Sequence, residues 1–453
     1  MIGNSPQNRA RRFAGKAATC GPLLLYLLFR AFPLWGYSVL SHEALIDAAW
    51  KHSIVPLLLS RYPNATAANL RRARAYAYGG CVIQDLGYYP FGNHFFSNLT
   101  HYVRTGDFVV ALLRDSRNID EYAFALGALS HYVADNTGHP LAVNLSVPQM
   151  YPKLRKKYGK RVTYEEDPRA HIMTEFSFDV VQVTGAGYLP RTYHNFIGFT
   201  VPERLLNRAF EDTYGLKPSE LFWFEGVSLK VYEVSASEII PDLGQDLWRH
   251  ERKKLYRVDP QIVTARFSYR LSRQNYERPP SQHRSRRLRP WTWNWKSTAK
   301  RANVHLLART LVLVIEVMPK VGSLQTLSFR PPTVPVQDLF IKGFDVTVAR
   351  YESDLWKLRH GNLVLPEENL DTGEPLEPGR YFLADETYAE LLNDLDKHHF
   401  HGLTPALRSD IVAYYNNPNA PIITKKHPRK WRKTLRELAA LRSAPVAKEV
   451  ASR

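Results

Sequence analysis

The stretch LGALSHYVADNTGHP, residues 126–140, places His131, Asp135 and His139 at successive steps of four inside an otherwise apolar run. Residues four apart lie on one face of an α-helix, with Cβ atoms about 6 Å apart, so one cation could bridge the imidazole of His131 and the carboxylate of Asp135. Gly138 and Pro140 indicate that the helix ends near His139, whose side chain would then point elsewhere. Because buried polar groups without partners destabilise a fold, the spacing favours a metal site inside a helical protein.

A second pair of the same spacing, His171 and Glu175, occurs in HIMTE. Other ligand-type residues stand upstream in apolar settings: His42, Asp85, His94 and His101. Taken singly, a residue of this kind is more often a structural histidine or a solvated acid. Only the whole set of residues indicates a shared metal site. Imidazoles and carboxylates without thiolates are typical of catalytic rather than structural zinc.

Helical periodicity dominates residues 40–250, and few segments alternate apolar and polar residues as a half-buried strand does. Further apolar helices are expected at residues 303–320, 338–358 and 383–399. The sequence therefore predicts an all-α fold with a mainly helical C-terminal extension.

Composition changes divide the chain into five parts. Residues 1–34 combine a basic start with an apolar run at 17–29 and predict a signal peptide or signal anchor, hence export to the periplasm, the envelope or the medium. Residues 35–260 are the expected catalytic domain, 261–302 a basic linker or insertion, 303–420 a helical region and 421–453 a basic tail, loose or a frayed helix. The net charge of +18 favours anionic partners.

The order of these residues resembles the zinc-dependent phospholipase C family, an all-helical fold that shares its three-zinc site with the zinc-dependent single-strand nucleases. The family order is an N-terminal Trp, a His, an Asp, a His, H-x-x-x-D, a His and H-x-x-x-E. The matching positions are Trp35, His42, Asp85, His101, His131 with Asp135, His139, and His171 with Glu175. The resemblance covers roughly residues 35–180, with helices to about 250 as its continuation.

The resemblance implies two or three zinc ions per chain. Asp135 would bridge two of them, with Asp85, His101 and His131 completing one site and His139, His171 and Glu175 forming another. His42 would hold the third zinc together with the amino group and carbonyl of Trp35, if the mature chain begins there. Asp85 would also act as general base toward the attacking water. His94 competes with His101 as a ligand, and we favour His101 because NLTHYV places it on an apolar helical face.

The function expected is that of an exported zinc-dependent phosphodiesterase of phospholipase C type, which hydrolyses a phospholipid with a metal-activated water. A peripheral contact with the membrane is expected as well. Two alternatives stay open: a single-strand nuclease, favoured by the basic charge and the Trp-rich stretch RPWTWNWK, and a non-catalytic, envelope-associated binding protein that keeps the helical core. The oligomeric state is not predicted.

Overall fold

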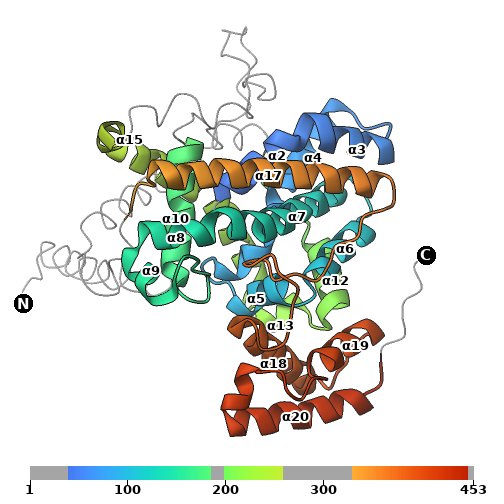
Figure 1. Cartoon of the computed structure of the whole chain (residues 1–453). Helices are drawn as coiled ribbons and strands as arrows, with labels where there is room; N and C mark the ends of the chain where they lie inside the picture. Colours follow the sequence, from blue (N-terminus) through green and yellow to red (C-terminus); the bar gives the residue numbers. More distant parts are fainter. Residues whose placement is uncertain (1–38, 185–197, 259–328, 447–453) are drawn as a thin grey trace, which may run out of the picture.

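The computed structural model describes residues 39–184, 198–258 and 329–446, and these residues fold into helices without any β-strand (Figure 1). The prediction of an all-α fold with a mainly helical C-terminal extension is therefore confirmed. Trp35, the apolar run at 17–29, the linker at 261–302 and the helix expected at 303–320 lie outside the described residues.

The first part of the chain forms short helices connected by tight turns. They are α2 (Val39–Ala49), η1 (Trp50–Ile54), α3 (Val55–Arg61), α4 (Ala67–Gly80), η2 (Ile83–Tyr88), α5 (His94–Tyr102), α6 (Thr105–Asp115), α7 (Ile119–Gly138), η3 (His139–Val143), α8 (Asn144–Met150), α9 (Pro152–Tyr158), α10 (Pro168–Phe178) and η4 (Asp179–Thr184). Helix α7 is central, because α2, α4, α6 and the later helix α17 all pack against it.

The second part continues with α12 (Glu203–Tyr214), α13 (Pro218–Leu221), α14 (Glu225–Val234), η5 (Ser235–Ile239) and α15 (Ile240–Val258). After the undescribed residues come α17 (Val334–Arg359), α18 (Phe382–Lys397), α19 (Pro405–Tyr414), η7 (Ile423–Lys426) and α20 (Pro428–Ser443). Helix α17 lies across α7 and α2, with Phe344, Val348 and Tyr351 buried between them.

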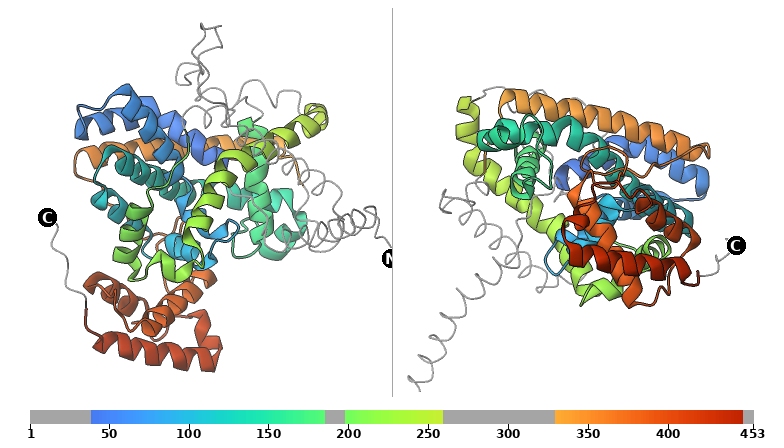
Figure 2. Two further views of the ribbon diagram at one scale, coloured as in Figure 1. Left: turned by 180° about the vertical axis from the view of Figure 1, so that it is seen from behind. Right: turned by 60° about the horizontal axis from the view of Figure 1, so that its bottom comes forward.

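Helices α18, α19 and α20 form a group at one end of the molecule, as Figure 1 and the left view of Figure 2 show. Helix α18 joins this group to the main body through α5. The expectation of a loose or frayed tail is wrong for α20, because Leu438 and Leu441 are buried against the group. The basic residues of α20 occupy its exposed face. Their number made the segment look like a loose tail, although its apolar residues form the stripe of a packed helix.

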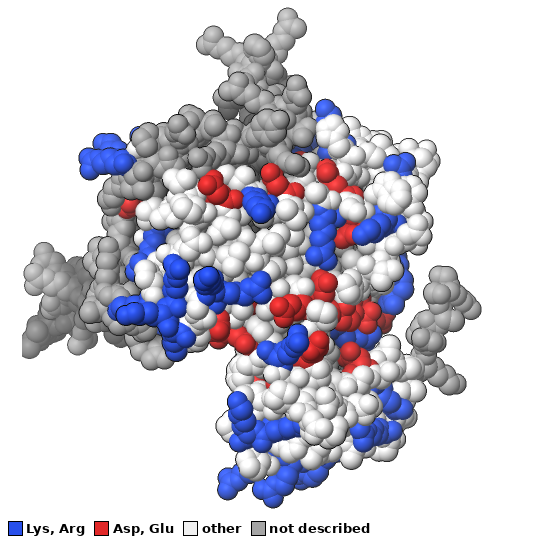
Figure 3. Space-filling view, viewed as in Figure 1, with Lys and Arg blue, Asp and Glu red and all other residues white. Residues whose placement is uncertain are grey.

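The domain boundaries expected from composition remain predictions, although α17 packs directly on helices of the expected catalytic domain. None of the helices in the described ranges is long and apolar enough to cross a membrane. Basic side chains gather on the visible face over α9 and along α20, with acidic side chains between these two places (Figure 3).

Candidate metal centre

Helix α7 places His131 beside α4 because the two helices cross closely. A Cβ atom on Gly127 would lie 2.2 Å from the carbonyl oxygen of Ala77, so only glycine allows this approach. The crossing brings the carbonyl of Cys81 within 3.0 Å of His131 Nδ1. Since a carbonyl can only accept, Nδ1 carries the proton and the lone pair of Nε2 is available for a metal.

Asp85 and His101 lie next to His131, on η2 and α5. His101 donates its Nδ1 proton to the carbonyl of Ser97 at 2.7 Å, which leaves its Nε2 free in the same way. His101 Nε2 lies 3.3 Å from Asp85 Oδ1 and 3.3 Å from His131 Nε2. We call Asp85, His101 and His131 the Asp85 group, whose ligand atoms all lie within 4.8 Å of one another.

Asp135 supplies a fourth atom to the Asp85 group. Its Oδ2 lies 3.2 Å from His131 Nε2 and 3.3 Å from His101 Nε2. Tetrahedral ligands at about 2.0 Å from a zinc ion lie about 3.3 Å from each other. The separations found here therefore fit one zinc ion, although the His131 to Asp85 pair is wider at 3.9 Å.

A second group forms where α7 continues into η3 and meets α10. His139 Nε2 lies 3.0 Å from Glu175 Oε1, and His171 Nε2 lies 3.5 Å from the same oxygen. We call His139, His171 and Glu175 the Glu175 group. The regular helix does end at Gly138, as predicted, but the chain stays helical through η3. His139 consequently faces Glu175 and also remains 3.6 Å from Asp135 Oδ1.

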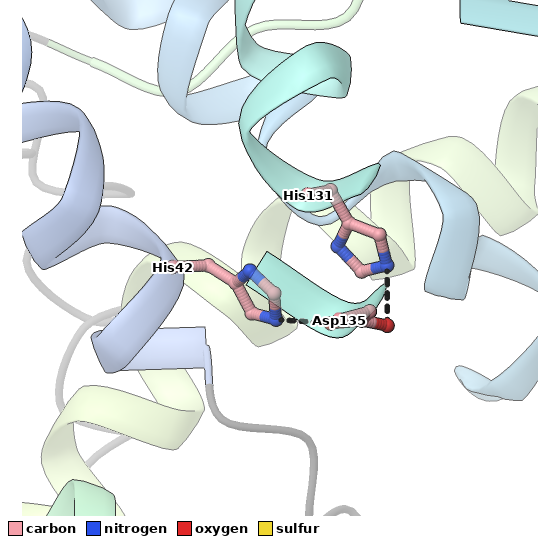
Figure 4. Close-up of side chains that lie close together, drawn as sticks. All are labelled: His42, His131 and Asp135. Carbon is pink, nitrogen blue, oxygen red and sulfur yellow. Dashed lines mark ion pairs between the residues drawn. The ribbon is translucent and has the colours of Figure 1, made fainter. Parts of the chain in front are cut away.

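Asp135 connects the two groups, since Oδ2 faces the Asp85 group and Oδ1 faces His139. His42 approaches from α2, with Nε2 3.4 Å from Asp135 Oδ1 (Figure 4). Its ring stacks on that of His131 at a centroid distance of 4.5 Å. His42, His131 and Asp135 thus form a third set that could hold a cation.

Several buried acid oxygens in this centre have no hydrogen-bond partner among the described residues. They are both carboxylate oxygens of Asp85 and Oε2 of Glu175. A buried carboxylate that lacks donors destabilises a fold unless a cation compensates it. The unpartnered oxygens and the imidazole-carboxylate donor set together fit zinc.

The metal-free electrostatics of the centre are strongly perturbed. Burial, reinforced by His131, lowers the pKa of His42 to about 3. Burial also disfavours the charged ring of His101, but the neighbouring carboxylates of Asp135 and Asp85 outweigh burial and raise its pKa to about 9. In the same way Asp135 and Glu175 outweigh burial and raise the pKa of His139 to about 10. A metal must therefore displace protons to bind.

The carboxylates shift in opposite directions. Burial raises the pKa of Asp85 despite its neighbouring histidines. For Asp135 burial is outweighed by His131 and His139, which hold the pKa well below its usual range. Asp135 is thus the more firmly ionised of the two and the better suited to lie between two cations.

The structure brings together eight of the nine residues predicted as ligands, and Trp35 lies outside the described residues. Their roles as ligands stay predictions. Of the two competing histidines, His101 lies in the Asp85 group, whereas His94 is exposed and contacts Tyr88 edge to face. The sequence analysis missed Asp371, a buried residue that lies 3.5 Å from His139 Nδ1. Its only local signal, a turn-like DTG, does not point to a metal centre.

Comparison with known proteins finds one family model that matches the part of the chain that carries this centre. Residues 41–224 match the family model described as zinc dependent phospholipase C. The match spans every described residue of the Asp85 and Glu175 groups, together with His42 and Asp135. No curated protein and no solved structure matches the chain.

Proposed function

We propose that this protein is a phosphodiesterase that hydrolyses phospholipids, because residues 41–224 match the family model described as zinc dependent phospholipase C. The observation that carries the proposal is the sharing of Asp135 between the Asp85 group and the Glu175 group. Adjacent zinc ions held there would polarise the phosphoryl group and activate water. Asp85, as the buried carboxylate with the raised pKa, is the expected general base.

A small pocket of about 60 Å³ with mainly apolar walls lies beside the metal centre. Asp135, His139 and Glu175 line it, and its walls also include aliphatic and aromatic side chains from α2, η3, α10 and α17: Leu45, Val143, Phe178, Phe340 and Phe344. A cavity of this size holds only a small apolar group, so the choice of a phospholipid as substrate rests on the family match.

The zinc content and substrate of the purified protein test the proposal. We expect at least two zinc ions per chain and turnover of phosphatidylcholine vesicles above that of single-stranded DNA. Asp135→Asn should lower the rate by more than about 100-fold, since even outer partners of metal ligands contribute up to about that factor. Asp385→Asn is the matched control, because Asp385 is also a buried, hydrogen-bonded aspartate but belongs to the α18–α20 group.

Each other outcome has a defined meaning. Preferential cleavage of DNA would replace the lipid proposal with the nuclease alternative. Full zinc occupancy without hydrolysis of any phosphodiester, including chromogenic ones, would favour a binding protein. Fewer than two tightly bound zinc ions, or an unchanged rate in Asp135→Asn, would contradict the proposal.

We propose further that the protein is exported and touches an anionic membrane surface. Export is supported by the basic start and apolar run of residues 8–29, and N-terminal sequencing of exported protein tests it. Membrane contact is supported by four exposed cations on and just after α9 that pair with no acid of the described residues: Lys153, Arg155, Lys156 and Lys160. Binding to anionic vesicles should then weaken with salt and in the Lys153→Gln, Lys156→Gln double variant.

A further inference from the structure

Three buried polar atoms meet on the outer side of the Glu175 group. Asp371 Oδ1 lies 3.5 Å from His139 Nδ1 and 3.8 Å from His171 Nδ1. None of the three atoms has a hydrogen-bond partner among the described residues. The side chains of Asp371 and His171 are 2% and 1% exposed, so bulk water does not reach them. Such an arrangement is costly unless these atoms interact with one another.

Asp371 is held firmly on its other oxygen. The hydroxyl of Tyr381 donates to Oδ2 at 2.6 Å, and the backbone N–H of Tyr164 donates to it at 2.9 Å. The backbone carbonyl of Asp371 accepts from the side-chain amide of Asn144 at 2.7 Å. With Oδ2 fully engaged, Oδ1 is the oxygen that faces the two imidazoles.

The segment that carries Asp371, residues 366–374, is attached to both α5 and α7. The N–H of Leu370 donates to the carbonyl of His101 at 3.1 Å. The hydroxyl of Tyr132 donates to the carbonyl of Pro366 at 2.7 Å, and Asn136 Nδ2 donates to Glu368 Oε2 at 2.7 Å. Asp371 is thus placed by the helices that carry the metal centre, although it follows α17 in the chain.

A carboxylate oxygen is only an acceptor, so an imidazole nitrogen that faces it carries the proton. The proton on Nδ1 leaves the lone pair of a neutral ring on Nε2, and in both histidines Nε2 is the nitrogen that faces Glu175. Carboxylates that accept from the outer nitrogen of a metal-binding histidine orient the ring and raise its basicity.

We propose that Asp371 is a positioning residue for the Glu175 group: it accepts the Nδ1 protons of both histidines and so directs both Nε2 lone pairs toward one zinc ion. The inference rests on the proposed function for the metal itself. It adds to that function a residue outside the family match at 41–224, so the C-terminal part of the chain completes the metal centre.

The protonation and metal binding of the histidine ring nitrogens, measured in the full-length protein, test this inference directly. Nitrogen-15 NMR of protein loaded with cadmium, which stands in for zinc, should show His139 and His171 bound through Nε2 with slowly exchanging Nδ1 protons. Asp371→Asn should shift those proton signals and weaken metal binding at one site by about 10- to 100-fold. Chelator competition should find the affinity of the other site unchanged, and Asp385→Asn should leave both sites as they are.

Binding through Nδ1, or Asp371→Asn with unchanged ring signals and affinities, would overturn the inference. If Asp371→Asn fails to fold, the wild-type spectra and Tyr381→Phe, which removes one donor to Asp371, still decide it. If the wild type binds no metal, the proposed function fails separately. The metal-free spectra then decide the role of Asp371, because it requires protons on both Nδ1 atoms that respond to Asp371→Asn.

Discussion

The Asp85 group and the Glu175 group hold the outer nitrogens of their histidines in different ways. In the Asp85 group the Nδ1 atoms of His101 and His131 donate to backbone carbonyls, those of Ser97 on α5 and of Cys81 directly after α4. In the Glu175 group the corresponding atoms face one carboxylate, that of Asp371, from far along the chain. The first group is therefore complete within the family match, and the second depends on a segment beyond it.

Because of this difference, substitutions should affect metal binding in the two groups in different ways. A backbone carbonyl cannot be removed by substitution, so the Asp85 group is sensitive to the spacing of its helices. The Glu175 group is sensitive to the place and charge of a single side chain. Variants that move one outer partner should therefore affect the two groups separately.

Gly127→Ala should have the largest effect, because the added Cβ would meet the carbonyl oxygen of Ala77 at 2.2 Å and push α7 away from α4. We expect a loss of about 3 kcal/mol in the free energy of unfolding. The carbonyl of Cys81 would move away from His131, so the Asp85 group should lose more metal affinity than the Glu175 group. Denaturant unfolding and metal titration measure the two effects, and an equal loss at both groups would contradict the comparison.

Gly373→Ala should act on the Glu175 group. Gly373 has φ +66°, and its added Cβ would lie 2.3 Å from the carbonyl oxygen of Asn136, so the segment bearing Asp371 must shift. We expect a destabilisation of about 2 kcal/mol and a loss of metal affinity at the Glu175 group.

Gly361→Ala is the matched control for this variant, with φ +72° but no atom within 4 Å of the added Cβ. It should destabilise the protein by about 1 kcal/mol and leave metal binding unchanged. A weakened metal site in the control would show that backbone strain alone accounts for the effect of Gly373→Ala.

The pH dependence of metal binding should be alike in the two groups. Each contains one histidine whose metal-free pKa lies above neutrality, about 9 for His101 and about 10 for His139. Below those values each metal ion displaces a proton, so its apparent affinity should rise about tenfold, or 1.4 kcal/mol, for each unit of pH. Titrations between pH 7 and 8.5 measure this slope. A flat profile at either group would mean that its histidine is already neutral.

Tyr381→Phe should have the smallest effect. It removes the hydroxyl that donates to Asp371 Oδ2, for which we expect a loss of about 1 kcal/mol in stability and a few-fold weaker metal binding at the Glu175 group. Tyr414→Phe removes a matching hydroxyl that donates to Asp385 at 2.6 Å. We expect Tyr414→Phe to lower the free energy of unfolding by a similar amount and to leave metal binding unchanged. Weaker metal binding in Tyr414→Phe would contradict the distinction between Asp371 and Asp385.

Much of the metal centre could be predicted from local spacing. His131 with Asp135, and His171 with Glu175, stand one helical turn apart, and a helix places such pairs together whatever surrounds it. The distinction between His94 and His101 also followed from the apolar face around His101. Asp85 and His42 were predicted only from the order of the motifs along the chain. No local pattern indicates that these two residues contact α7.

The helices and the two spaced pairs of ligand-type residues follow from the amino-acid sequence alone, because each depends on residues close together in the chain. The packing of the helices, in contrast, turns Oδ1 and Oδ2 of Asp135 toward different groups, and η3 keeps His139 near Asp135. The same packing brings Asp371 to the Glu175 group. That residue lies in a turn whose position is set by contacts with α5, α7 and α8, and these contacts exist only once the helices have packed.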